Sequence, residues 1–137
     1  MTNLHEPKRV SADPDIFEAF YISQAFKVGN LVYTSGQAAL DERGNVVGPG
    51  DFDAQAEQTF KNLRLVLEAA GSSLERVFKV TIYLTDMQYF PRILDLRKKH
   101  FTPPWPADTI VEVQALALPD LMIEIEAIAV IGEVHDV

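Results

Sequence analysis

The sequence contains no cysteine among its 137 residues. This absence excludes disulfide bonds, a thiolate nucleophile and thiolate ligands for a metal. Histidine is scarce as well, and His5, His100 and His135 are too scattered to resemble a set of metal ligands. We therefore expect no metal site. The lack of cysteine also agrees with a reducing compartment, so we expect a cytoplasmic protein.

Basic residues are few, with 12 Lys and Arg against 20 Asp and Glu, and the formal net charge is −8. Such a surface repels nucleic acids, whose phosphates bind mainly to Lys and Arg. The cluster of Arg92, Arg97, Lys98 and Lys99 is interpreted as the solvated face of a helix. No run approaches the ~20 apolar residues of a membrane span, and the first residues lack the apolar segment of a signal peptide. We expect neither nucleic acid nor a membrane as a partner.

Repeats and linkers are also absent, and the length suits a single domain, residues 1–137. Residues 1–15 are expected to form an irregular N-terminal arm with a helix start at Asp13, and residues 41–51 a loop. The order of the remaining elements is β-β-α-β-α-β-β. Their predicted ranges are strands 24–27, 31–35, 77–84, 108–116 and 122–131 and helices 52–70 and 87–101.

The last predicted strand has two different faces. Its wholly apolar face suits two helices packed on one side of a single sheet, an α/β (α+β) fold; this face consists of Ile123, Ile125, Ala127, Ala129 and Ile131. The other face mixes two glutamates with apolar residues; it consists of Met122, Glu124, Glu126, Ile128 and Val130. Because only two long helices are available, this second face would lie in water in a monomer. Its apolar part predicts an oligomer whose sheets face each other.

Glutamates on the strands are the best candidates for chemistry. Glu112, Glu124 and Glu126 alternate along strands, and this parity predicts that they face away from the helices. Glu124 and Glu126 lie about 7 Å apart by strand rise. Partial burial beside a like charge would raise the pKa of one of them, as an acid–base catalyst needs. Glutamates on edge strands also serve solubility, so both interpretations stay open.

Two other motifs offer less. Ser35 lacks both the G-x-S-x-G elbow and an evident histidine base, which argues against a nucleophile. Residues 44–50 contain three glycines but no following Lys-Ser/Thr, so turn chemistry explains them better than a phosphate-binding loop does.

Four segments, 28–37, 62–74, 77–86 and 123–129, resemble one known family in sequence and in order. They are similar to the RidA family, also called YjgF, and the resemblance covers about residues 23–131. It implies a chorismate-mutase-like fold and a homotrimer that binds a small molecule at the subunit interfaces. It also implies hydrolysis of reactive enamines and imines, such as 2-aminoacrylate, to 2-oxo acids and ammonia without a cofactor.

The resemblance implies site residues as well. Glu124 matches the family's glutamate that positions water. The family's arginine in a Pro-Ala-Arg-Ser/Thr segment grips the substrate carboxylate with its bidentate fork. Here the matching segment is Trp105-Pro106-Ala107-Asp108-Thr109, and Ile110 replaces a common cysteine. The family's pocket tyrosine aligns with Ile22, one place from Tyr21.

The exchange of arginine for Asp108 reverses a charge. An aspartate about 4 Å from a substrate carboxylate costs on the order of 4 kcal/mol at an effective dielectric constant of about 20. Imines derived from amino acids are therefore expected to be poor substrates. We expect Glu124 to activate water and Asp108 to hold a cationic nitrogen or shuttle its proton. The expected substrate-binding residues are Tyr21, Ser35, Gly36, Trp105, Thr109 and Ile110.

Three alternatives stay open. The pocket could be non-catalytic and bind a small metabolite or a partner. A ribonuclease activity is also attributed to some family members, and the acidic charge disfavours it. Asp108 could instead be a strand-start cap that faces water.

Overall fold

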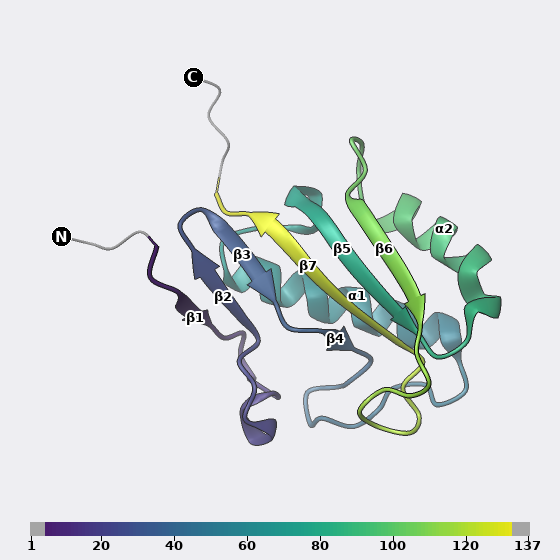
Figure 1. Ribbon diagram of the computed structural model, residues 1–137. Coiled ribbons are helices and arrows are strands. Elements are labelled where there is room, and N and C mark those ends of the chain that lie inside the picture. Colours follow the sequence, from purple (N-terminus) through teal and green to yellow (C-terminus); the bar gives the residue numbers. More distant parts are fainter. Residues whose placement is uncertain (1–4, 133–137) are drawn as a thin grey trace.

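The computed structural model describes residues 5–132 and consists of one mixed sheet with two helices on the same face (Figure 1). The helices are α1 (Phe52–Ala69) and α2 (Phe90–His100). The strands are β1 (Lys8–Val10), β2 (Ala25–Val28), β3 (Leu31–Thr34), β4 (Gln37–Ala38), β5 (Val77–Leu84), β6 (Ala107–Glu112) and β7 (Ile123–Val130). The strand order is β1-β2-β3-β7-β5-β6, with β4 also paired to β7. We call the sheet face away from the helices the open face.

Turn and cap residues explain where the main elements begin and end. Gly29, with φ 60°, lies in the tight turn between β2 and β3. Asp51 caps α1 by accepting a hydrogen bond from the Ala54 N–H at 3.1 Å. Gly71, with φ 86°, follows the end of α1. Because α2 crosses over between β5 and β6, these two strands are parallel, whereas the other described pairs are antiparallel.

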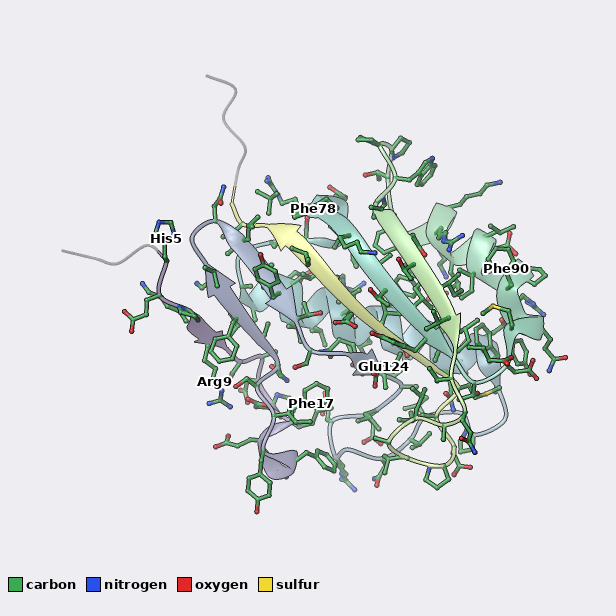
Figure 2. All side chains as sticks on the ribbon, viewed as in Figure 1. His5, Arg9, Phe17, Phe78, Phe90 and Glu124 are labelled. Atoms are coloured by element: carbon green, nitrogen blue, oxygen red, sulfur yellow. The ribbon has the colours of Figure 1, made fainter. Side chains whose placement is uncertain are left out.

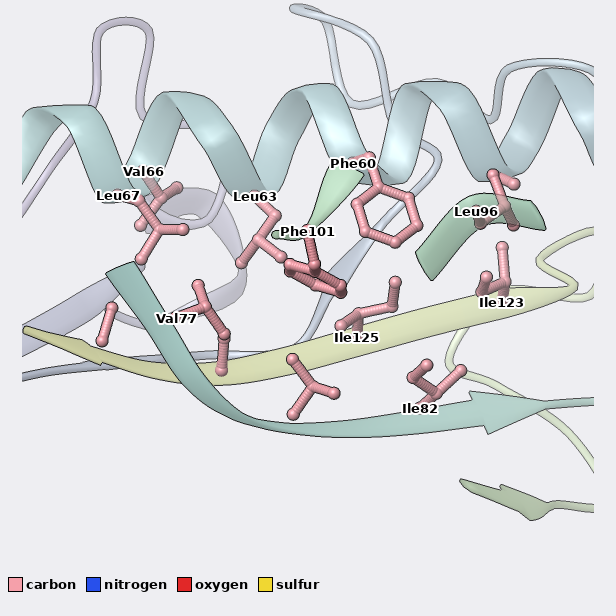
Figure 3. Packing of buried hydrophobic residues seen from close by; sticks show 14 of the residues in the cluster. Phe60, Leu63, Val66, Leu67, Val77, Ile82, Leu96, Phe101, Ile123 and Ile125 are labelled. Carbon is pink, nitrogen blue, oxygen red and sulfur yellow. The ribbon is translucent and has the colours of Figure 1, made fainter. Parts of the chain in front are cut away.

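The core lies between the two helices and the sheet (Figure 3). Phe60, Leu63 and Leu67 of α1 are almost fully buried in one cluster with Ile123 and Ile125 of β7. Full burial of one such side chain contributes about 1.5–3 kcal/mol to folding. The apolar face of β7 predicted from the sequence is therefore the sheet's side of the core, as expected.

Gln55 ties α1 to the loop before β7. Its side chain is fully buried. The amide nitrogen donates to the backbone oxygen of Asp120 at 2.7 Å, and the amide oxygen accepts from the Met122 N–H at 2.8 Å. These bonds satisfy backbone groups that no strand ladder reaches, so Gln55 fixes where the loop enters β7.

Several predicted boundaries are wrong at the N-terminal end. β1 lies inside the arm that was expected to be irregular, and it pairs with β2. The helix start expected at Asp13 is absent; the first helical turn described is η1 (Glu18–Phe20), and Asp15 accepts a hydrogen bond from the Phe17 N–H at 3.0 Å. β4, which follows Gly36, was not predicted, because a strand of two residues is too short to show an alternating pattern.

Simple alternation does not give the side-chain directions at two places in β5 and β6. A bulge between Val77 and Lys79 turns Val77 into the core and leaves Phe78 exposed. Glu112 was predicted to face away from the helices, and this is wrong. It pairs with buried Leu84 of β5 and accepts a hydrogen bond from the Met87 N–H at 2.8 Å, at the start of η3 (Met87–Tyr89) before α2. The side that a strand turns to the core depends on its register with its neighbour, which alternation within one strand does not determine.

The open face keeps apolar side chains in water within the single chain. Phe26 of β2, Tyr33 of β3 and Val111 of β6 are between 38% and 44% exposed. Phe26 pairs with Tyr33, which pairs with Ile128 of β7, and Val111 pairs with Tyr83 of β5. Exposed apolar side chains of this kind favour burial against another subunit. The oligomer expected from the sequence stays a prediction.

Candidate active site

Glu124 lies in a pocket of about 350 Å³ on the open face, near the start of β7. We call it the glutamate pocket. Figure 2 labels Glu124 together with Phe17, which comes from the segment before β2. The other lining residues come from the same segment, from the β3–β4 link and from the loop before β7, and most are apolar; they include Phe20, Ile22, Leu118 and Leu121. Of the described residues that line this pocket, Glu124 is the only titratable one.

Gly36 lets the Glu124 carboxylate lie directly against the backbone. A Cβ atom on Gly36 would be 2.5 Å from Oε2 of Glu124 and 2.6 Å from its Cδ. Any larger residue would therefore displace the carboxylate. Ser35, which also lines the pocket, donates its hydroxyl to the backbone oxygen of Ser23. Both residues predicted to bind substrate here, Ser35 and Gly36, are thus next to Glu124.

The two neighbouring glutamates of β7 have different surroundings. Burial raises the pKa of Glu124, and repulsion by Glu126 adds to this effect. Among the described residues, no hydrogen bond reaches the Glu124 carboxyl. Glu126, by contrast, accepts a hydrogen bond from the Tyr83 hydroxyl. This bond, with burial and the negative charges nearby, raises the pKa of Tyr83 to about 12.

Asp108 lies on the opposite face of the sheet, beneath α2. It pairs with Val80 of β5, whose side chain is in the core. Arg97 of α2 binds Asp108 through two hydrogen bonds, from Nε to Oδ2 at 3.0 Å and from Nη2 to Oδ1 at 2.9 Å. The two side chains are only 25% and 17% exposed. Asp108 therefore does not face Glu124 within the chain, and it does not cap the strand in water.

The Arg97–Asp108 pair lines a second pocket, of about 560 Å³, at the edge of the sheet. We call it the edge pocket. Leu94 and Phe101 of the α2 region and Trp105, which is 54% exposed, supply apolar lining. Trp105 was predicted to line the substrate pocket, and it does lie beside Asp108. The structure thus divides the predicted site residues between two pockets.

The remaining predicted site residues lie elsewhere in the single chain. Tyr21 is 98% exposed with φ 61°, and its neighbour Ile22 lines the glutamate pocket in its place. Thr109 is on the open face, where its hydroxyl accepts a hydrogen bond from Nζ of Lys79 at 3.0 Å. Ile110 packs against the core. The substrate-binding roles of Tyr21, Thr109 and Ile110 have no contact here that supports them.

Sequence reasoning missed two side-chain contacts, one in the edge pocket and one beside Glu124. Arg97 was interpreted as part of a solvated helix face, and its partner Asp108 is eleven residues away across a loop. Tyr83 was placed correctly on β5, but its hydroxyl contact with Glu126 joins strands 43 residues apart. No residue spacing or sequence motif could have revealed either pair, because both pairs depend on how the helices and strands pack together.

The described residues provide no group of three or more His, Asp or Glu side chains that could hold a metal ion. Nor is any helix within residues 5–132 both long and apolar enough to cross a membrane.

Known proteins resemble this chain over most of its length. A family model described as Endoribonuclease L-PSP matches residues 16–131. A RutC family protein of Pyrococcus horikoshii is 42% identical over 107 residues, which are 78% of this chain and 84% of that protein. The crystal structure of RidA from an Antarctic Psychrobacter matches with a TM-score of 0.75 and 36% sequence identity. The match covers 96% of this chain and 98% of the Psychrobacter chain. The chain belongs to the RidA family.

Membership in the RidA family confirms the resemblance found in the sequence and the predicted fold class. A 2-iminobutanoate/2-iminopropanoate deaminase of Dermatophagoides farinae is 38% identical over 126 residues, 91% of this chain and 98% of that protein. RidA-family relatives therefore include proteins named as imine deaminases. This RidA-family chain keeps the expected glutamate, Glu124, in a pocket, and it pairs Asp108 with an arginine from α2.

Proposed function

We propose that this RidA-family protein hydrolyses a reactive imine or enamine that carries no carboxylate, releasing ammonia. The observation that carries the proposal is the single carboxyl group of Glu124 in a largely apolar pocket. Burial raises the pKa of this carboxyl group, and a carboxyl group with a raised pKa is better suited to act as a general acid. The deaminase names of two relatives support C=N hydrolysis as the general reaction.

The proposed reaction uses Glu124 as the only proton carrier. The protonated carboxyl gives its proton to the imine nitrogen, and the oxygen of a water molecule adds to the imine carbon. The proton that this water loses returns to Glu124, which leaves a neutral carbinolamine. Glu124 then protonates the amino nitrogen, the C–N bond breaks, and ammonia leaves as the hydroxyl proton returns to Glu124 and the carbonyl forms.

The charges near the two pockets support a substrate without a carboxylate. The described lining of the glutamate pocket contains no cation. In the edge pocket, Asp108 occupies the fork of Arg97, so this arginine does not present its paired nitrogens to an anion. Bidentate arginine is the usual protein partner for a carboxylate. A neutral or cationic imine therefore fits this chain better than a 2-imino acid.

We further propose that the working form is a homotrimer. Each site would combine the glutamate pocket of one subunit with the edge pocket of its neighbour, so that Trp105 and Asp108 face Glu124 across the interface. Two features support this arrangement: the outer edge of β6, which ends the sheet, and the exposed apolar residues of the open face. A neighbouring subunit would shield the strand edge from solvent and bury the apolar side chains. The cytoplasmic location expected from the sequence stays a prediction.

Ammonia release tests the proposal. A neutral imine and 2-aminoacrylate, each generated in the assay, are compared with their rates in buffer alone. We expect turnover of the neutral imine, loss of that turnover in Glu124→Gln, and a rate near background for 2-aminoacrylate. Glu75→Gln makes the same side-chain substitution at an exposed position in η2 (Leu74–Arg76) and should leave the rate unchanged.

Two results would contradict the proposal. If no imine is hydrolysed above the buffer rate, the pocket is a binding site for a small metabolite and not a catalytic one. If 2-aminoacrylate is the better substrate, a cation of the protein binds the substrate carboxylate. Arg97 would then be the first residue to replace by mutation.

A further inference from the structure

The Tyr83 hydroxyl and the Glu126 carboxylate form a contact that the proposed reaction does not use. Tyr83 is the cross-strand partner of Glu124, but its hydroxyl reaches the diagonal neighbour Glu126. The hydroxyl donates, and an oxygen of the Glu126 carboxyl group accepts. The high pKa of Tyr83, about 12, keeps the proton on the phenol throughout the neutral range. The contact therefore holds one fixed negative charge on the open face.

This fixed charge lies next to the reacting group of the proposed site. Glu124 and Glu126 are two residues apart on the same face of β7, which corresponds to about 7 Å along a strand. Gly36 leaves room for the Glu124 carboxylate against the backbone, because a Cβ there would be 2.5 Å from Oε2. Repulsion between the two carboxylates disfavours the ionised form of Glu124.

Other charges near this pair leave the repulsion in place. Lys79, the cation of β5 on this face, donates to the Thr109 hydroxyl and to the backbone oxygen of Val80, and no ion pair with Glu126 is present among the described residues. Arg9 of β1 binds Asp15. Tyr33 of β3 pairs with Ile128 on the same face, and Tyr33, Glu18 and Asp120 do not line the glutamate pocket.

We infer that Glu126 is a positioning residue for Glu124, held by the Tyr83 hydroxyl so that its negative charge favours the protonated form of Glu124. This inference rests on the proposed function for its catalytic meaning. The charge thereby favours the form of Glu124 that gives a proton to the imine nitrogen in the proposed reaction. Neither Tyr83 nor Glu126 needs to touch the substrate.

Carbon-13 NMR of the glutamate side-chain carboxyl groups tests the inference without any substrate. The signal of Glu124 is assigned by its loss in Glu124→Gln and followed from acid to neutral pH. In Glu126→Gln, the titration midpoint of Glu124 should move to lower pH. Tyr83→Phe, which keeps the ring but frees the Glu126 carboxylate, should move it in the same direction by less. Glu75→Gln is the matched control and should not move it.

The pH profile of kcat/KM supplies the second readout. The limb that reports protonated Glu124 should move to lower pH in Glu126→Gln together with the NMR midpoint. A merely structural role would lower kcat/KM at every pH without moving this limb. An unchanged Glu124 midpoint in Glu126→Gln overturns the inference. If the midpoint moves but no imine is hydrolysed, the coupling stands and the proposed function is wrong.

Discussion

The Arg97–Asp108 pair should stabilise the fold more than an ordinary surface ion pair does. Exposed pairs contribute about 0.2–1 kcal/mol, because water screens them and the side chains lose entropy. Here the side chains are 25% and 17% exposed and make two parallel hydrogen bonds. Two charges about 4 Å apart attract by about 4 kcal/mol at an effective dielectric constant of about 20. Desolvation offsets much of this, so we expect a coupling free energy of about 1–2 kcal/mol.

A double-mutant cycle in urea unfolding measures this coupling. The proteins are the wild type, Arg97→Gln, Asp108→Asn and the double variant, all at one protomer concentration because assembly adds to stability. The matched control is the Arg92–Asp53 pair, which has the same 2.9 Å contact but is 59% and 60% exposed. Its cycle should give less than about 0.5 kcal/mol. Equal coupling in the two cycles would refute the reasoning.

The same pair should influence which substrates are accepted. Asp108→Arg replaces the carboxylate with a second cation beside Arg97, so the rate on 2-aminoacrylate should rise relative to a neutral imine, by about tenfold or more if ~1.4 kcal/mol of carboxylate binding is recovered. Ammonia release on both substrates gives the ratio. An unchanged ratio, in a variant that stays folded and assembled, would mean that Asp108 does not face the substrate.

Three further predictions concern single residues. Gly36→Ala should abolish imine hydrolysis while circular dichroism stays that of the wild type, because a Cβ would lie 2.5 Å from Oε2 of Glu124; full activity would refute the close approach. Gln55→Leu should lower the free energy of unfolding by about 2–4 kcal/mol, since two buried backbone groups lose their partners, and a loss below about 0.5 kcal/mol would contradict this. Burial lowers the pKa of His100 from its ordinary 6.5, although Glu57 opposes this. The unfolded chain therefore binds more protons at His100 than the folded chain does. The free energy of unfolding of the wild type should consequently rise between about pH 6 and 7.5. His100→Phe should flatten that rise in urea titrations, and an unchanged slope would assign it to another group.

Local patterns in the sequence determined most of the fold. The helix predicted for residues 52–70 agrees with α1 to within one residue, because a helix period and its end signals are local properties. The alternation of β7 predicted which of its faces the helices cover. The resemblance of four segments to the RidA family singled out Glu124 before any geometry was known.

Tertiary structure alone decided what surrounds the chemical groups. The charge of Asp108 could be recognised in the sequence, but its partner Arg97 could not, because the register of β6 on β5 and the packing of α2 bring the two together. The contact of Tyr83 with Glu126 likewise depends on the pairing of β5 with β7. A sequence specifies which charges exist and on which local face they lie. The neighbours that neutralise or reinforce each charge come from long-range packing, because electrostatic effects depend on distance and burial.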